Sequence, residues 1–194
     1  MSKIYLIEND GYDFKWLGLE IHNIIDLIPE EYSLKQIHQF SLHNLSLGEY
    51  WKDVSTTFKP NFDRIGDPIP DISLWLGYAS LVLSEKAFDA LNDLFKDFGE
   101  FLPIDCNGNT FHIFNCRVLA AADESKSKQV IFNGEVVGIE KIVFDESETA
   151  GKLIFKSKYN SCVDLFCGDE FKNAVEKHAL KGVVFSSDLA PSFE

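Results

Sequence analysis

The chain has 194 residues, of which 45% are hydrophobic, which is enough for a core and excludes an intrinsically disordered protein. Its net charge of −13 excludes the basic surface that binding to nucleic acid or to an anionic membrane requires. No stretch approaches the roughly 20 apolar residues of a membrane span, and residues 1–10 do not resemble a signal peptide, so we expect a cytoplasmic protein. The acidity either attracts a basic protein partner or serves solubility.

The first third of the chain predicts short strands and irregular structure. Residues 4–7 and 14–21 indicate strands, and residues 34–47 alternate loosely and indicate a strand or irregular structure. Residues 48–70 predict a connection, because each proline removes a backbone donor and fixes φ. We therefore expect an N-terminal lobe over residues 1–68 and a core domain over residues 69–194.

A helix is predicted in the middle of the chain, after a strand at residues 81–83. Ser84 is a suitable N-cap, because its side-chain oxygen can accept from an otherwise unpaired backbone N–H. Gly99 is the expected stop. The residues at helical spacing that form the expected buried stripe are Ala87, Phe88, Leu91, Leu94, Phe95 and Phe98.

The second half predicts hairpins and a late helix. Residues 101–104 and 110–119 flank an Asn-Gly turn at 107–108, and residues 129–132 and 135–139 flank a second one at 133–134. Residues 141–144 and 152–156 are predicted strands on either side of an acidic turn. A helix is expected from near Asp169, with Gly182 as its C′ residue. The residues expected on its apolar face are Phe171, Ala174, Val175 and His178. A last strand is expected at residues 183–185. This order predicts an α+β fold with a largely antiparallel sheet and a few packed helices.

Motifs that carry catalysis or hold a cofactor do not occur in the sequence. There is no GxGxxG or GxxxxGK loop, no HExxH pair and no GxSxG elbow. Cys162 and Cys167 could form half of a zinc knuckle with Cys106 and Cys116, but the latter two are too far apart for a tight pair. We expect reduced structural thiols, with no metal, no cofactor and no catalytic residue.

His112 and Cys116 lie four residues apart on one predicted strand and therefore on one face. With Asp105 or Asp123 they could form the thiol–histidine site of a hydrolase. Because large apolar side chains share that face, we interpret the pair as part of the core. The carboxylate pairs at residues 30–31 and 123–124 are expected to be solvated.

Exposed aromatic rings among charges are typical anchors of protein interfaces. The segment 49–53 offers such rings, with the alternative that Trp51 packs the two lobes together, whereas Trp75 is expected in the core. The acidic loops either meet a basic partner or are simply solvated. The predicted partner-binding residues are Glu49, Tyr50, Trp51, Asp63, Asp67, Asp145, Glu146 and Glu148.

Several segments occur in an order that resembles a known family. They are residues 69–72, 81–87, 100–104, 111–116, 119–127 and 180–185. The chain is similar over about residues 69–188 to family eleven of the immunity proteins of bacterial polymorphic toxin systems, first catalogued as a domain of unknown function. Residues 121–123 are Ala-Ala-Asp, whereas the family often has a Leu-Asp step there.

The resemblance implies a cytosolic protein without catalytic residues that binds and neutralises a cognate toxin. Such toxins are often nucleases with basic surfaces, which would suit the charge of −13. Two other interpretations are a regulatory or scaffold protein with a different partner, and a hydrolase that uses His112 and Cys116. Genomic context distinguishes an immunity protein from a regulatory or scaffold protein, because an immunity gene should lie beside a toxin gene.

Overall fold

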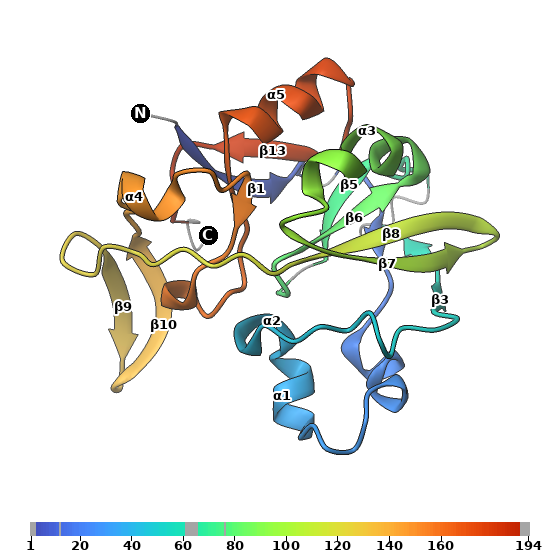
Figure 1. Cartoon of the computed structure of the whole chain (residues 1–194), viewed down its shortest axis with the longest axis horizontal. Coiled ribbons are helices and arrows are strands. Elements are labelled where there is room, and N and C mark those ends of the chain that lie inside the picture. Colours follow the sequence, from blue (N-terminus) through green and yellow to red (C-terminus); the bar gives the residue numbers. More distant parts are fainter. Residues whose placement is uncertain (1–2, 12, 61–65, 76, 191–194) are drawn as a thin grey trace.

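A five-stranded sheet forms the centre of the computed structural model, which describes residues 3–11, 13–60, 66–75 and 77–190 (Figure 1). The β7–β8 hairpin turns at Asn107 and Gly108, which both take the positive φ angles of a tight turn, as predicted. All pairings of this sheet are antiparallel except the parallel pair β3–β7. Its order is β3 (Ser55–Thr56), β7 (Gly99–Cys106), β8 (Asn109–Cys116), β6 (Ser80–Ser84) and β5 (Ile72–Trp75).

Helix α3 (Glu85–Phe95) packs on one face of this sheet. The Ser84 side chain accepts from the Ala87 backbone N–H, which confirms the predicted N-cap. Leu81 and Leu83 share a core cluster with the helix, and the Phe95 ring stacks on Phe114 with centroids 4.5 Å apart. The apolar stripe of the helix therefore buries itself against alternate residues of the strands.

A second sheet joins the two ends of the chain. Its order is β11 (Ile154–Phe155), β12 (Phe166–Gly168), β1 (Ile4–Asn9) and β13 (Val183–Ser186). Helix α5 (Asp169–Lys177) follows β12 and buries Phe171 and Val175 in the same core cluster as α3. Strand β1 thus lies between two strands that follow it by more than 150 residues in sequence.

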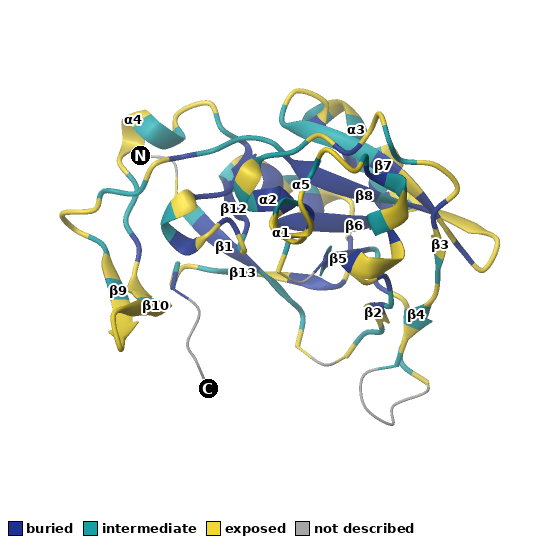
Figure 2. Cartoon of the chain, turned by 90° about the horizontal axis from the view of Figure 1, so that it is seen from below, coloured by how far each residue is buried: buried dark blue, intermediate teal, exposed yellow. Residues whose placement is uncertain are grey.

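The N-terminal segments cover the other face of the five-stranded sheet. Their apolar residues, such as Ile24 and Phe40, form a cluster with Trp75, Val82 and Ile113 of the sheet. Figure 2 shows the central strands β6 and β8 as buried, dark blue ribbon. Trp75 is buried, as predicted. The elements are β2 (Trp16–Leu17), which pairs with β4 (Phe58–Lys59), the short 3-10 helices η1 (Ile21–Asn23) and η2 (Ile25–Leu27), and the helices α1 (Leu34–His38) and α2 (Phe40–His43).

A hairpin of β9 (Lys128–Phe132) and β10 (Glu135–Lys141) projects from the lower left of the molecule (Figure 1). Asn133 and Gly134 at its turn have positive φ, as the sequence predicts. The short helix α4 (Glu146–Thr149) and the 3-10 helix η3 (Lys158–Asn160) follow it in the chain. Antiparallel pairing dominates the described sheets, which confirms the α+β prediction.

Three predictions for the N-terminal half and α4 were wrong. Residues 34–47 contain two short helices instead of a strand or irregular structure, because Ser33 and Gln36 form a capping box and Ile37, Phe40 and Ser41 are buried at helical spacing. Of the predicted strand 14–21, only Trp16–Leu17 is paired. The acidic turn is helix α4, and β11 after it pairs with β12 instead of closing a hairpin.

Both predicted helix stops also lie elsewhere. Helix α3 ends at Phe95, and Gly99 begins β7, where a Cβ would collide with the Phe114 ring and with a backbone oxygen. Helix α5 ends at Lys177, and Ala179 takes the left-handed conformation after it. Gly182, with φ of 116°, passes too close to the backbone of β5 for any side chain. His178 is exposed, not packed on the apolar face, because it caps the helix beyond its last turn.

Candidate functional site

Two loops that are distant in sequence bring a pair of tyrosines together beside exposed glutamates. The Tyr32 and Tyr50 rings meet edge to face with centroids 6.3 Å apart. A hydrogen bond with Tyr32, then burial, then the charges of Glu49 and Glu31 raise the pKa of Tyr50. Glu30, Glu31 and Glu49 are exposed, and the tyrosines are half-buried. We call Glu30, Glu31, Tyr32, Glu49 and Tyr50 the tyrosine–glutamate surface.

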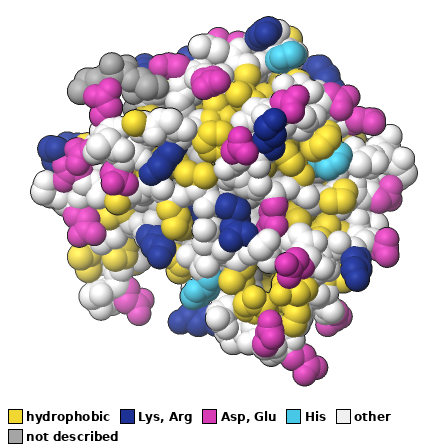
Figure 3. Space-filling model, viewed as in Figure 1, with side chains coloured by type: hydrophobic (Ala, Val, Ile, Leu, Met, Phe, Trp, Pro, Cys, Tyr) yellow, Lys and Arg dark blue, Asp and Glu magenta, His cyan; other side chains and the backbone are white. Residues whose placement is uncertain are grey.

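This surface combines negative charge with aromatic area. In Figure 3, acidic side chains surround a hydrophobic patch over the lower part of the molecule, where α1 and the loops beside it lie. The sequence placed Glu49 and Tyr50 in a binding site but took Glu30 and Glu31 only as solvated carboxylates. The dipeptide Glu-Tyr occurs at residues 31–32 and again at residues 49–50. This repetition is the sequence signal from which both loops could have been predicted to belong to one surface.

Trp51 connects the same loop to the central sheet. Its indole N–H donates to the Pro103 carbonyl oxygen on β7 at 2.7 Å, and its ring packs against the N-terminal core cluster. The structure therefore supports the alternative in which Trp51 holds the N-terminal segment on the sheet. Its ring is half-buried, so part of it remains available beside Tyr50.

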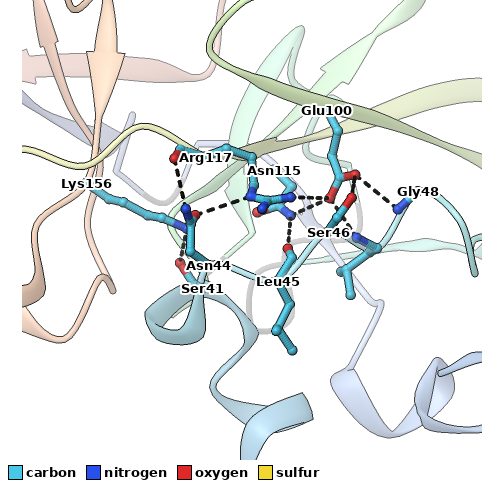
Figure 4. Close-up of polar contacts among 10 residues, drawn as sticks. Ser41, Asn44, Leu45, Ser46, Gly48, Glu100, Asn115, Arg117 and Lys156 are labelled. Atoms are coloured by element: carbon cyan, nitrogen blue, oxygen red, sulfur yellow. Dashed lines mark hydrogen bonds and ion pairs between the residues drawn. The ribbon is translucent and has the colours of Figure 1, made fainter. Parts of the chain in front are cut away.

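Glu100 fixes the loop before Glu49 by accepting four hydrogen bonds (Figure 4). One carboxylate oxygen accepts from the Leu47 N–H and the Asn115 side chain, both at 2.7 Å. The other accepts from the Ser46 hydroxyl at 2.7 Å and the Gly48 N–H at 3.0 Å. Hydrogen bonds to a charged acceptor are the stronger kind, so this loop is held in one conformation.

The same polar layer continues to the end of α2. Asn44, in the left-handed conformation, donates to the Arg117 carbonyl oxygen at 3.1 Å and accepts from the Arg117 side chain at 3.3 Å. Asn115 also donates to the Leu45 carbonyl oxygen at 3.1 Å. Glu100 on β7, Asn115 on β8 and Arg117 after β8 thus position the stretch from Asn44 to Gly48.

The other predicted binding residues do not join this surface. Asp145, Glu146 and Glu148 lie at α4, which Figure 1 shows at the upper left, well apart from α1 and the loops beside it at the bottom. Asp145 pairs with Lys126 at 3.5 Å, and Glu148 pairs with Lys152 at 3.8 Å. Asp67 is half-buried before β5. Asp63 lies outside the described residues.

The thiol–histidine pair lacks the properties of a nucleophilic site. Cys116 is fully buried, and burial raises the pKa of its thiol to about 11, so it is not a thiolate at neutral pH. Its sulfur lies near the carbonyl oxygens of Val118 and Ile154, at 3.8 and 3.9 Å. His112 instead stacks on the Phe88 ring, with centroids 3.8 Å apart, and burial lowers its pKa.

All four cysteines are buried and free, and they pack as small apolar side chains. Within the described ranges, no group of three or more His, Cys, Asp or Glu side chains has the arrangement of a metal site. No helix in those ranges is both long and apolar enough to cross a membrane.

Most of the chain matches the model of a known protein family. The model of a family described as Immunity protein family (Imm11) matches residues 13–188. This confirms the resemblance noted in the sequence and extends it to the N-terminal segments, including both tyrosines of the candidate surface. No curated protein matches the chain.

Proposed function

Because the chain belongs to the immunity protein family Imm11, it is an immunity protein, and we propose that it protects its cell by binding a basic surface of a cognate toxin. The family match over residues 13–188 supports the immunity role. The family description concerns immunity, which favours a non-enzymatic role. We place the protein in the cytoplasm, where its free cysteines would stay reduced.

The charge of the chain suits such a partner. A protein with a net charge of −13 attracts a basic toxin over long distances and accelerates their encounter. Because Glu100 holds the segment directly before Glu49 and Tyr50, ordering this loop costs little conformational entropy on binding. We propose that this surface, with Trp51 beside it, contacts the toxin and occludes or distorts its active site.

The acids at α4, together with Asp63 and Asp67, remain predicted contacts. Asp145 and Glu148 already have lysine partners, so their net attraction for a basic surface is weaker. We therefore expect their charge reversal to weaken toxin binding less than charge reversal of Glu31 and Glu49.

The proposed function is tested by co-expressing this protein with the toxin domain encoded beside its gene and recovering the complex from the lysate. Growth rescue with a stable complex supports immunity by binding. Rescue without a complex indicates enzymatic reversal of the damage, and His112 and Cys116 become the residues to substitute. Neither rescue nor complex would favour a regulatory or scaffold role with another partner.

The tyrosine–glutamate surface is tested with the double variant Glu31→Lys/Glu49→Lys. The toxin's association rate constant should fall at least about tenfold, and its dependence on salt should flatten, because charge at an interface acts mainly on encounter. The matched control is Asp93→Lys/Asp97→Lys, which changes the net charge equally at exposed positions at the end of α3. If both variants changed the rate equally, the effect would be one of net charge, and the surface would be excluded as a contact.

A further inference from the structure

The β9–β10 hairpin exposes apolar side chains that no other part of the described chain covers. Ile131 and Phe132 are 64% and 66% exposed, and Val130, Val136 and Val137 are exposed as well. Figure 3 shows hydrophobic side chains gathered at the lower left, where Figure 1 places the hairpin. A contiguous apolar patch of this kind marks an interaction site in a soluble protein.

Apolar residues occupy both faces of the hairpin near its tip. Ile131 lies opposite Val136 and shares their face with Gln129, whereas Val130 and Phe132 alternate onto the other face. A two-stranded hairpin is only marginally stable in water by itself. A partner that covered one face would leave the other exposed, so the hairpin fits a cleft that surrounds its tip.

A groove continues one of these faces at the base of the hairpin. It has a volume of about 500 Å³ and is lined by Leu119, the alanines at 120–122, Glu124, Gln129, Lys158 and Tyr159. The Gln129 side chain donates to the Tyr159 carbonyl oxygen at 3.0 Å, which ties the hairpin to this wall. Because Gln129 lies on the face of Ile131 and Val136, the groove and that face form one continuous surface.

Charge favours the toxin over a second copy of this chain as the occupant. Residues 128–141 carry Lys128, Lys141, Glu135 and Glu140, so the hairpin is neutral, and Lys128 pairs with Glu140. A second copy would bring another charge of −13, which opposes self-association. The same charge attracts a basic protein.

We propose that the β9–β10 hairpin inserts into an apolar cleft of the toxin while a toxin segment lies in the alanine groove. This inference rests on the proposed function and assigns different roles in toxin binding to two parts of the protein. The acidic surface governs how fast the complex forms, and the apolar hairpin governs how long it lasts.

The proposal is tested with the double variant Ile131→Thr/Phe132→Thr in the full chain, with the purified toxin domain from the neighbouring gene as the probe. Threonine keeps the strand propensity but removes the large apolar surface. The dissociation rate constant should rise at least about tenfold, whereas the association rate constant should stay within about threefold. The control Val184→Thr changes an exposed apolar residue on β13 and should leave both constants unchanged.

A second variant tests the groove and guards against misfolding of the hairpin. Ala121→Leu places a larger side chain at an exposed position that lines the groove and should also accelerate dissociation. Thermal unfolding midpoints within about 3 °C of wild type would show that each variant is folded. If Ile131→Thr/Phe132→Thr fails this criterion, the dissociation rate constant of Ala121→Leu decides whether the proposal holds.

Three results would overturn the inference. Dissociation at the wild-type rate in the folded variants would exclude the hairpin while leaving toxin binding, and hence the proposed function, intact. A wild-type dimer in sedimentation velocity that Ile131→Thr/Phe132→Thr converts to monomer would identify a second copy as the occupant. Failure of the wild-type protein to bind the toxin at all would remove both proposals together.

Discussion

Lys156 is the charged residue most completely removed from solvent among those that the structure describes. Its ammonium donates to the Ser41 hydroxyl at 3.3 Å, and in the described part of the chain no carboxylate lies within the 4.0 Å of a salt bridge. Ser41 donates in turn to the Cys162 carbonyl oxygen at 2.9 Å. Burial lowers the pKa of Lys156, since a charge without a counterion is costly away from water.

Replacing Lys156 with methionine should therefore raise the free energy of unfolding at pH 7, by about 1 kcal/mol or more. The variant removes the buried charge, and Ser41 keeps its bond to the Cys162 carbonyl oxygen. Urea unfolding measures the change. The exposed residue Lys96, replaced by methionine, is the control and should change stability by less than about 0.5 kcal/mol.

The pH dependence follows from the same residue. The unfolded lysine keeps its proton up to the ordinary lysine pKa of 10.5, whereas the folded one loses it at lower pH. Between these two values the unfolded state binds more protons, so this residue makes stability rise with pH. The rise should disappear in Lys156→Met, and an equal slope in both proteins would exclude Lys156 as its origin.

Single residues with a strong local role could be predicted from the sequence. Ser84 caps α3 and the two Asn-Gly steps make tight turns, because each depends on neighbours a few residues away. Tyr32 could not be assigned to the site, since its partner Tyr50 is reached only through the fold. The burial of Lys156 likewise depends on the approach of α2 to β11, and neither segment predicts it alone.

At the scale of elements, the loop at residues 46–48 has no regular structure and depends on one carboxylate. Glu100→Ala removes the acceptor of the Leu47 and Gly48 N–H groups, so their amide hydrogen exchange should accelerate at least about tenfold. Hydrogen exchange followed by NMR measures this. Toxin binding should weaken as the tyrosine–glutamate surface loses its fixed conformation.

Ser46→Ala provides the comparison for this variant. It removes one of the four donors to Glu100 and leaves both backbone donors paired. The Leu47 and Gly48 amides should then remain protected. If Glu100→Ala left them equally protected, packing of Leu47, which is buried, would hold the loop instead of the carboxylate.

Elements in which apolar residues recur at a clear helical or strand spacing could be predicted from the sequence, whereas very short elements could not. Helices α3 and α5 and the β7–β8 hairpin follow local patterns of spacing and turn residues. Helices α1 and α2 have five and four residues, too few for a helical period to stand out from loose alternation. The β9–β10 strands were predicted, but the exposure of their apolar residues was not, because a short apolar run usually indicates a buried strand.

At the scale of the whole molecule, the arrangement depends on contacts between distant segments. The sequence does not show that β1 lies between β12 and β13, or that α4 and the tyrosine loops lie apart. Residue types therefore predicted acidic and aromatic contacts, whereas the fold decides which of them share a surface. The division into residues 1–68 and 69–194 stays a prediction.

Contacts across residue 68 bear directly on that division. Strand β1 pairs with two C-terminal strands, and Ile24 and Phe40 are buried in one cluster with Val82 and Ile113. We therefore expect a single unfolding transition for the full chain in urea. In a Trp75→Phe background, fluorescence follows Trp16 and Trp51 of residues 1–68, and far-UV circular dichroism follows the whole chain.

The variant Ile24→Ala makes this expectation specific. Ile24 is fully buried, so its truncation should cost about 2–4 kcal/mol and should lower the fluorescence and dichroism midpoints by the same amount. The exposed residue Leu34, replaced by alanine, should leave both midpoints nearly unchanged. If only the fluorescence midpoint fell in Ile24→Ala, residues 1–68 would unfold independently of residues 69–194. Equal shifts would instead mean that the loops of the tyrosine–glutamate surface and the central sheet share one stability, because the cluster that joins them forms and breaks as a unit.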